Sequence, residues 1–276
     1  MSRTRKPPGY GSLSLRGAAL LYVGLLIVLP VIAISSRALG GGITSLWTQI
    51  TSPQAMAALK LTLLMAFIMV LINVVTGTAM AWVLVRYRFP LKKVINAMID
   101  IPFAIPTVVT GIMLVVLYGP RSILGTLFSR MGVEIIFDKP GIVLALLFVT
   151  FPFVVRSVQP VLMEMEPDME EAAQTLGASR SVTFFRIVLP TLLPAILTGA
   201  ALSFSRALGE FGSVVIVAGN IPLKTQTAPV YVFGEIESGN VQSAMGVSLF
   251  LLFSSFLVLV MLKLIQNRSQ RHVEST

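Results

Sequence analysis

Few residues in this chain could carry enzymatic chemistry. It has 276 residues with no cysteine, and its one histidine, His272, lies close to the C-terminus. We therefore expect no thiol chemistry, zinc cluster or histidine acid–base pair. The phosphate-binding pattern G-x-x-x-x-G-K-[S/T] is also missing, so we expect no bound cofactor and no ATP hydrolysis on this chain. A membrane-embedded enzyme would lack the side chains that most reaction types need.

Acidic side chains are concentrated in one segment. Five of the twelve acidic residues fall within eight positions, namely Glu164, Glu166, Asp168, Glu170 and Glu171. Pro167 suits the first turn of a helix, where acidic side chains also face the positive end of the helix dipole. Gly177 can adopt the left-handed conformation that ends a helix. The segment of about 167–177 is therefore predicted to be a short helix, and Ala172 and Ala173 would let another surface approach it closely.

A second pair of charged residues lies inside an apolar stretch. Arg206 and Glu210 are four positions apart and share a face if the helix continues that far. Ionisable residues at membrane depth usually face a partner or a water-filled path. Gly209 and Gly212 flank Glu210 and could loosen the helix. Two interpretations follow: Arg206 attracts a divalent oxyanion along a path, or the two residues form an ion pair that fixes a gate or a subunit interface. The second is favoured, because Glu210 would offset the attraction of Arg206 for an anion.

These charged residues are separated by long apolar runs. The chain is 55% hydrophobic and 12% charged, with a mean hydropathy of +0.87, whereas soluble domains have about 25% charged residues. About 20 apolar residues cross the hydrocarbon core of a membrane. The sequence therefore predicts an all-α polytopic membrane protein with a single domain at residues 18–265. Six spans are expected, at Ala18–Ser36, Leu61–Val85, Ile101–Tyr118, Gly141–Val155, Ile187–Ala207 (continuing less regularly towards Ala218) and Ser243–Ile265.

Prolines and tryptophans add two smaller expectations. Pro102 and Pro106 could kink the third span, and Pro190 and Pro194 could kink the fifth. Trp47 and Trp82 are predicted to be anchors at the membrane interface.

The distribution of basic residues predicts the topology. Fourteen of the 21 Lys and Arg residues lie in the N-terminal tail, in the loops after the second and fourth spans, or at the C-terminal end. The positive-inside rule then places both tails, 1–17 and 266–276, in the cytoplasm. The net charge of +9 largely follows from this topology, so nucleic-acid binding is not expected. A cleaved signal peptide is the alternative for the first span, but its apolar run, 17–34, is longer than a usual signal core.

The acidic segment belongs to a longer pattern of fixed residues, which are Glu171, Ala172, Ala173, Gly177, Ile187, Leu189 and Pro190. At every fixed position this pattern is similar to the EAA motif of bacterial ABC importer permeases. The resemblance implies the type I ABC importer permease fold with six transmembrane helices. It also implies that 167–177 is the coupling helix, which docks on a separate ATPase subunit that binds ATP.

Further segments resemble the oxyanion branches of this family. Tyr87–Pro90 and Ile99–Pro106 are similar to sulfate and molybdate permeases, and Pro152–Leu162 to the sulfate branch. Ser203–Gly212 resembles both branches, and Ala218–Pro222 looks more like the T-type than the W-type sulfate/thiosulfate permease. The resemblance implies import of sulfate or thiosulfate across the bacterial inner membrane. Its expected partners are a W-type permease in a heterodimer, ATPase subunits and a periplasmic sulfate-binding protein.

Two alternatives stay open. A molybdate or related oxyanion importer would share most of these segments. An ion-coupled secondary transporter would work without an ATPase and commonly has repeated halves, which this sequence does not show.

Overall fold

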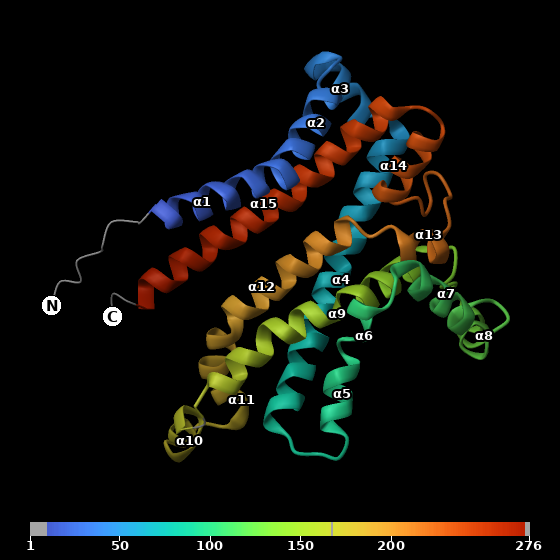
Figure 1. Ribbon diagram of the computed structural model, residues 1–276. Coiled ribbons are helices and arrows are strands. Elements are labelled where there is room, and N and C mark those ends of the chain that lie inside the picture. The colour runs from blue at the N-terminus through green and yellow to red at the C-terminus, as the bar shows by residue number, and fades with distance from the viewer. Residues whose placement is uncertain (1–9, 167, 274–276) are drawn as a thin grey trace.

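The computed structural model describes residues 10–166 and 168–273, and within these ranges the regular structure is entirely helical (Figure 1). Two short π-helical turns, η1 and η2, interrupt the α-helices. The elements are α1 (Tyr10–Val23), η1 (Gly24–Val28), α2 (Leu29–Ala38), α3 (Gly42–Ile50), α4 (Pro53–Arg86), α5 (Lys92–Met98), α6 (Ile101–Ala104), α7 (Thr107–Tyr118), α8 (Ile123–Arg130), α9 (Lys139–Glu164), α10 (Asp168–Thr175), α11 (Arg180–Thr183), η2 (Phe184–Val188), α12 (Leu189–Leu208), α13 (Gly212–Ala218), α14 (Ala228–Glu237) and α15 (Val241–Val273).

Five helical segments are long and apolar enough to cross a membrane, which confirms the predicted all-α membrane architecture. They are Leu15–Ala38, Pro53–Arg86, Lys139–Glu164, Arg180–Leu208 and Val241–Met261. The second begins well before the predicted Leu61, because Ser52 caps the helix by accepting a hydrogen bond from the Ala55 N–H at 3.4 Å. At the other end of the chain, α15 continues to Val273, so most of the predicted C-terminal tail is helical.

The predicted third span, Ile101–Tyr118, is wrong as a single helix. The segment Lys92–Ala104 and the helix α7 meet at an angle of 114°. Ile105, between them, is extended, with φ −87° and ψ 129°. Pro106 favours this geometry, because a residue that precedes proline is biased away from the helical region.

The chain nevertheless crosses the membrane between α4 and α9. These two helices pack side by side. Arg86, the last residue of α4, forms an ion pair with Glu170, which follows closely after the end of α9. Both helices therefore end on the same side, and the segment between them must return to the other side. We conclude that α5, α6 and α7 together make one broken span. It is the third in chain order and brings the total to six.

The centre of the molecule is a bundle of α4, α9 and α12, each packed against the other two (Figure 1). Asn73 of α4 donates a hydrogen bond to the Thr150 hydroxyl of α9 at 2.8 Å. The hydroxyl of Ser203, on α12, donates to the Thr150 carbonyl at 3.3 Å. All three side chains are fully buried, so this polar contact fixes how the three helices are aligned along their axes.

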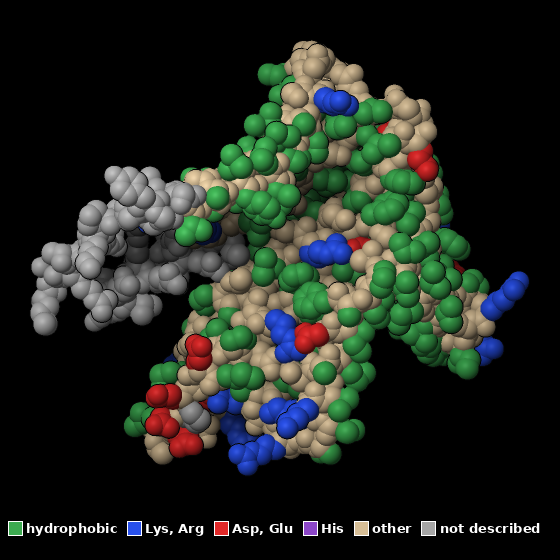
Figure 2. Space-filling model, viewed as in Figure 1, with side chains coloured by type: hydrophobic (Ala, Val, Ile, Leu, Met, Phe, Trp, Pro, Cys, Tyr) green, Lys and Arg blue, Asp and Glu red, His purple; other side chains and the backbone are tan. Residues whose placement is uncertain are grey.

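The first and last spans lie at the edge of this bundle. The apolar window of Leu15–Ala38 has none of its residues buried, and α2 packs on α15. Figure 2 shows green, apolar side chains spread over much of the visible surface. Such a surface needs lipid or another membrane subunit to cover it.

The fifth span ends earlier than its irregular continuation suggested. The helix α12 stops at Leu208, and α13 is a separate helix packed against α7. Gly212 permits this contact, because a Cβ there would lie 3.0 Å from the Val108 nitrogen and would also meet the hydroxyl of Thr107.

Candidate functional site

The helix α10 occupies the predicted coupling segment, 167–177. Its described part is Asp168–Thr175, and Pro167 lies outside the described residues. Gly177 has φ +87° and donates its N–H to the Gln174 carbonyl at 3.0 Å. The Ala178 N–H donates to the Ala173 carbonyl at 3.0 Å. These two bonds are the pattern by which a left-handed glycine ends a helix.

One face of α10 is free for a partner. Glu171 and Ala172 are exposed, Ala173 is half-buried, and Leu176, just beyond the helix, is 88% exposed. Figure 2 shows acidic side chains gathered at this end of the molecule, at the lower left where α10 lies, with Lys and Arg side chains nearby. The exposed face of α10 therefore combines the apolar side chains of Ala172 and Leu176 with the negative charge of Glu171.

The opposite face of α10 is held by α4. Glu170 forms an ion pair with Arg86, and the two side chains are only 17% and 19% exposed. The Arg86 guanidinium lies 5.5 Å from the centre of the Trp82 ring, which in turn packs edge-on against Phe184 at 5.4 Å. Trp82 is therefore half-buried against η2, so it has a packing contact besides the interfacial position predicted for it.

The remaining motif residues lie in the wall of the bundle. Ile187, in η2, and Leu189, the first residue of α12, are half-buried and pack against the core cluster that contains Leu84, Val158 and Leu192. Pro190 follows on the first turn of α12 and is exposed. The motif is thus divided between an exposed helix and the packed start of α12.

Arg206 and Glu210 form an ion pair with 2.8 Å between Nη2 and Oε2. The Glu210 side chain is 1% exposed, whereas that of Arg206 is 36% exposed. The pair spans the break after α12, where Gly209 is exposed and α-helical geometry has ended. The other carboxylate oxygen of Glu210 accepts hydrogen bonds from the Ser213 N–H at 2.9 Å and the Ser213 hydroxyl at 2.8 Å.

Glu210 therefore joins the end of α12 to the start of α13, and Gly212 sets α13 against α7. The sequence did not point to Ser213. No local pattern singles out this serine, because glutamate is not among the residues that commonly cap helix N-termini.

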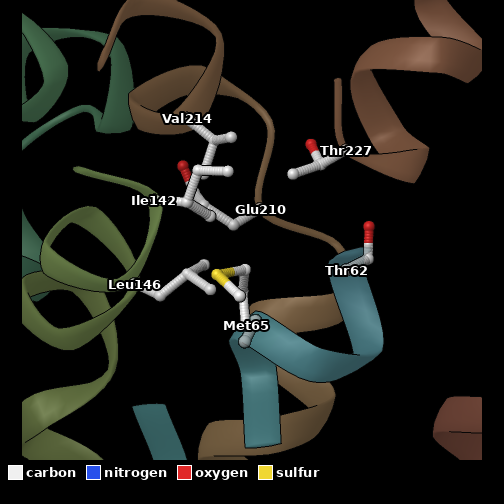
Figure 3. A pocket seen from close by; sticks show the side chains of 8 residues that line it. Thr62, Met65, Ile142, Leu146, Glu210, Val214 and Thr227 are labelled. Carbon is white, nitrogen blue, oxygen red and sulfur yellow. The ribbon is translucent and has the colours of Figure 1, made fainter. Parts of the chain in front are cut away.

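A small cavity lies beside Glu210 (Figure 3). It is lined by Glu210, Thr62, Thr227 and apolar side chains including Met65 and Ile142. Its volume is about 10 Å³, which is at the lower limit for one water molecule. A tetrahedral oxyanion does not fit in a cavity of this volume.

The coupling segment and the charged pair are far apart. They lie near opposite ends of α12, and Leu189 and Arg206 are separated by about 25 Å at 1.5 Å per residue. The structure does not bring the two predicted sites together, but one helix links them.

A third polar cluster was missed by the sequence analysis. Arg156 of α9 donates to both carboxylate oxygens of Asp100 at 2.8 and 2.7 Å. It also donates to the side chain and the carbonyl of Asn96 at 2.8 and 2.7 Å, and to Gln159 at 2.6 Å. All five donors of the guanidinium are thereby used. The cluster fastens α5 and the start of α6 to α9.

Comparison with known proteins identifies the family. The family model described as "Binding-protein-dependent transport system inner membrane component" matches residues 73–275. The sulfate transport system permease protein CysT of Salmonella typhimurium is 41% identical over 99% of this chain and 98% of its own length. The probable sulfate transport system permease protein cysT of Chlorokybus atmophyticus is 45% identical over 92% of this chain and 89% of its own length.

Solved structures share the fold at low sequence identity. A chain of a bacterial alginate ABC transporter, in complex with an alginate-bound periplasmic protein, has a TM-score of 0.74 at 17% identity, covering 96% of this chain and 95% of that chain. A chain of the inward-facing MetNI methionine ABC transporter has a TM-score of 0.58 at 17% identity, with coverage of 79% and 99%. The fold is that of type I ABC importer permeases. The chain belongs to the family of binding-protein-dependent transport system inner membrane components, and it is a permease subunit of an ABC importer in which ATP hydrolysis resides on a separate subunit.

Proposed function

We propose that this chain is the T-type permease of an importer that moves sulfate and thiosulfate across the inner membrane. The observation that carries the proposal is the similarity to CysT of Salmonella typhimurium, at 41% identity over 99% of the chain. The aligned region covers 273 residues and so includes both the coupling segment and the Arg206–Glu210 region. A molybdate or related oxyanion importer is the alternative outcome of the test below.

The proposed assembly contains a W-type permease as the partner in a heterodimer, two ATPase subunits that bind ATP, and a periplasmic sulfate-binding protein. Both termini are cytoplasmic in this proposal. Two observations support the orientation. The end of α4 lies beside α10, as the Arg86–Glu170 ion pair requires, and the segments that follow α4 and α9 contain Arg88, Lys92, Arg180 and Arg186. This chain itself binds no cofactor in the proposal.

The ATPase is proposed to dock on the exposed face of α10, through Glu171, Ala172, Ala173 and the turn at Gly177. Movement of α10 then passes along the chain to Ile187, Leu189 and Pro190, at the start of α12. Because α12 is a continuous helix from Leu189 to Leu208, it carries the displacement to the charged pair about 25 Å away.

At that end, the Arg206–Glu210 pair is proposed to act as part of the gate. Glu210 compensates the charge of Arg206 and caps α13 through Ser213, so the pair sets the angle between α12 and α13. Gly209 supplies the hinge between these helices, and Gly212 keeps α13 close to α7. The Arg206 side chain is 36% exposed, and in this proposal its exposed part is available to a passing anion.

Uptake of labelled sulfate tests the substrate. Cells that lack their own T-type permease are complemented with this chain, and unlabelled thiosulfate or molybdate is added as a competitor. We expect restored uptake that thiosulfate blocks and a low concentration of molybdate does not. Failure to restore sulfate uptake, together with rescue of a molybdate-permease mutant, would replace the proposed substrate and leave the fold unchanged.

A further inference from the structure

We propose that Arg86 and Glu170 form a positioning pair that makes the coupling helix and the end of α4 move as one body. The proposal rests on the proposed docking of the ATPase on α10. It goes beyond that docking because neither residue belongs to the exposed docking face. In this view α4 receives the movement of α10 directly, and not only through the chain that leads to α12.

The pair is well shielded from water for two residues at the surface of a membrane protein. The side chains of Arg86 and Glu170 are 19% and 17% exposed, whereas Asp168 and Glu171 on the same helix are exposed. Glu170 is thus the acidic residue of α10 that turns towards the bundle. Shielded, charge-assisted contacts of this kind are stronger than exposed ion pairs.

Without this pair α10 would be attached mainly through its own chain neighbours. Its ends connect to α9 and to α11, and its main packing contacts are with α11 and η2. Arg86 lies 84 positions away in sequence and belongs to a different helix of the bundle. The ion pair therefore adds an attachment to a third element.

The same turn of α4 also holds η2. Trp82 lies one helical turn before Arg86, under its guanidinium at 5.5 Å, and contacts Phe184 edge-on at 5.4 Å. Both the coupling helix and the turn that begins the fifth span are thus fixed to one site at the end of α4. Because α4 extends from there through the whole bundle, a displacement of α10 would move both α4 and α12.

The complete importer, reconstituted in proteoliposomes with its ATPase, second permease and binding protein, tests the positioning role. We compare Glu170→Gln with Asp168→Asn, which removes an exposed acidic group from the same helix. Both variants should retain the ATPase during purification and hydrolyse ATP within about twofold of the original rate. Glu170→Gln should lower the amount of labelled sulfate transported per ATP by about fivefold or more, because coupling free energies are typically of this size. Asp168→Asn should leave this ratio unchanged.

A covalent replacement of the ion pair provides the matching rescue. Since the chain has no cysteine, the double variant Arg86→Cys/Glu170→Cys can be joined with a short bis-methanethiosulfonate reagent. Each cysteine thiol displaces methanesulfinate and forms a disulfide to the linker, which a reductant cleaves. We expect cross-linking to restore the sulfate-to-ATP ratio to within about twofold of the original, and cleavage to lower it again. Equal ratios for Glu170→Gln and Asp168→Asn, or no recovery on cross-linking, would overturn the proposal.

The failure of the proposal can be distinguished from a failure of the proposed function. If Glu170→Gln alone loses the ATPase, Glu170 is a docking residue and the positioning pair is overturned, while docking on α10 stands. If the unaltered chain captures no ATPase, the proposed docking itself has failed.

Discussion

At the scale of single residues, Glu210 has a well-defined set of partners. Its buried carboxylate receives one cationic partner, Arg206, and two hydrogen bonds from Ser213. The substitution Glu210→Gln removes the negative charge and leaves Arg206 without its counter-ion. We expect a loss of about 2 kcal/mol in the free energy of unfolding, less than for a fully buried pair because Arg206 reaches water.

Thermal unfolding of the detergent-purified protein measures this loss. Ser213→Ala is the control, since it removes one hydrogen bond and should cost about 1 kcal/mol. An equal or smaller loss for Glu210→Gln would contradict the role assigned to the ion pair.

Gly177 makes a second prediction at the scale of single residues. No atom lies within 4 Å of a Cβ built there, so the cost of Gly177→Ala comes from its φ of +87° alone. We expect about 1 kcal/mol of local destabilisation and a fall of about fivefold in ATPase capture, measured by co-purification at limiting ATPase. Gly177→Asn should be tolerated better, because asparagine adopts left-handed geometry more readily. Full capture by both variants would show that the turn does not shape the docking face.

Among the elements, the broken span formed by α5, α6 and α7 depends most on a single side chain. Arg156 uses all five of its donors to fasten α5 and the start of α6 to α9. Arg156→Lys keeps the charge but cannot form the paired hydrogen bonds to Asp100. We expect a loss of about 2 kcal/mol in stability and faster amide hydrogen exchange in residues 92–104.

Arg88→Lys is the matched control, since Arg88 is exposed on the loop between α4 and α5. It should leave both quantities unchanged. Equal exchange in the two variants would mean that the cluster does not hold the broken span.

The elements also show where sequence reasoning reaches its limit. Apolar runs located the long helices because spanning lipid demands them, and Gly177 marked the end of α10. The prolines did not separate a break from a continuous helix: Pro106 accompanies the 114° bend, whereas Pro152, Pro160 and Pro194 lie inside helices that continue. Tertiary contacts decide between these outcomes. The Arg86–Glu170 and Arg156–Asp100 contacts join residues 84 and 56 positions apart, and no local pattern pairs them.

For the whole molecule, the topology is the feature that follows from charge alone. With no native cysteine, single-cysteine variants can be labelled with a membrane-impermeant maleimide. Ser238→Cys, in the exposed turn between α14 and α15, should react in intact spheroplasts. Ser275→Cys, near the C-terminus, should react only after lysis. Labelling of Ser275→Cys in intact spheroplasts would contradict the cytoplasmic placement of the C-terminus.

The most direct test of the account is sulfate uptake by proteoliposomes that contain the assembled importer, with ATP and ion gradients controlled separately. We predict uptake that requires ATP, the ATPase and the binding protein, and that continues after ionophores have removed all ion gradients. Uptake that proceeds without the ATPase and stops when an ion gradient is removed would contradict the account, because it would make this chain a secondary transporter.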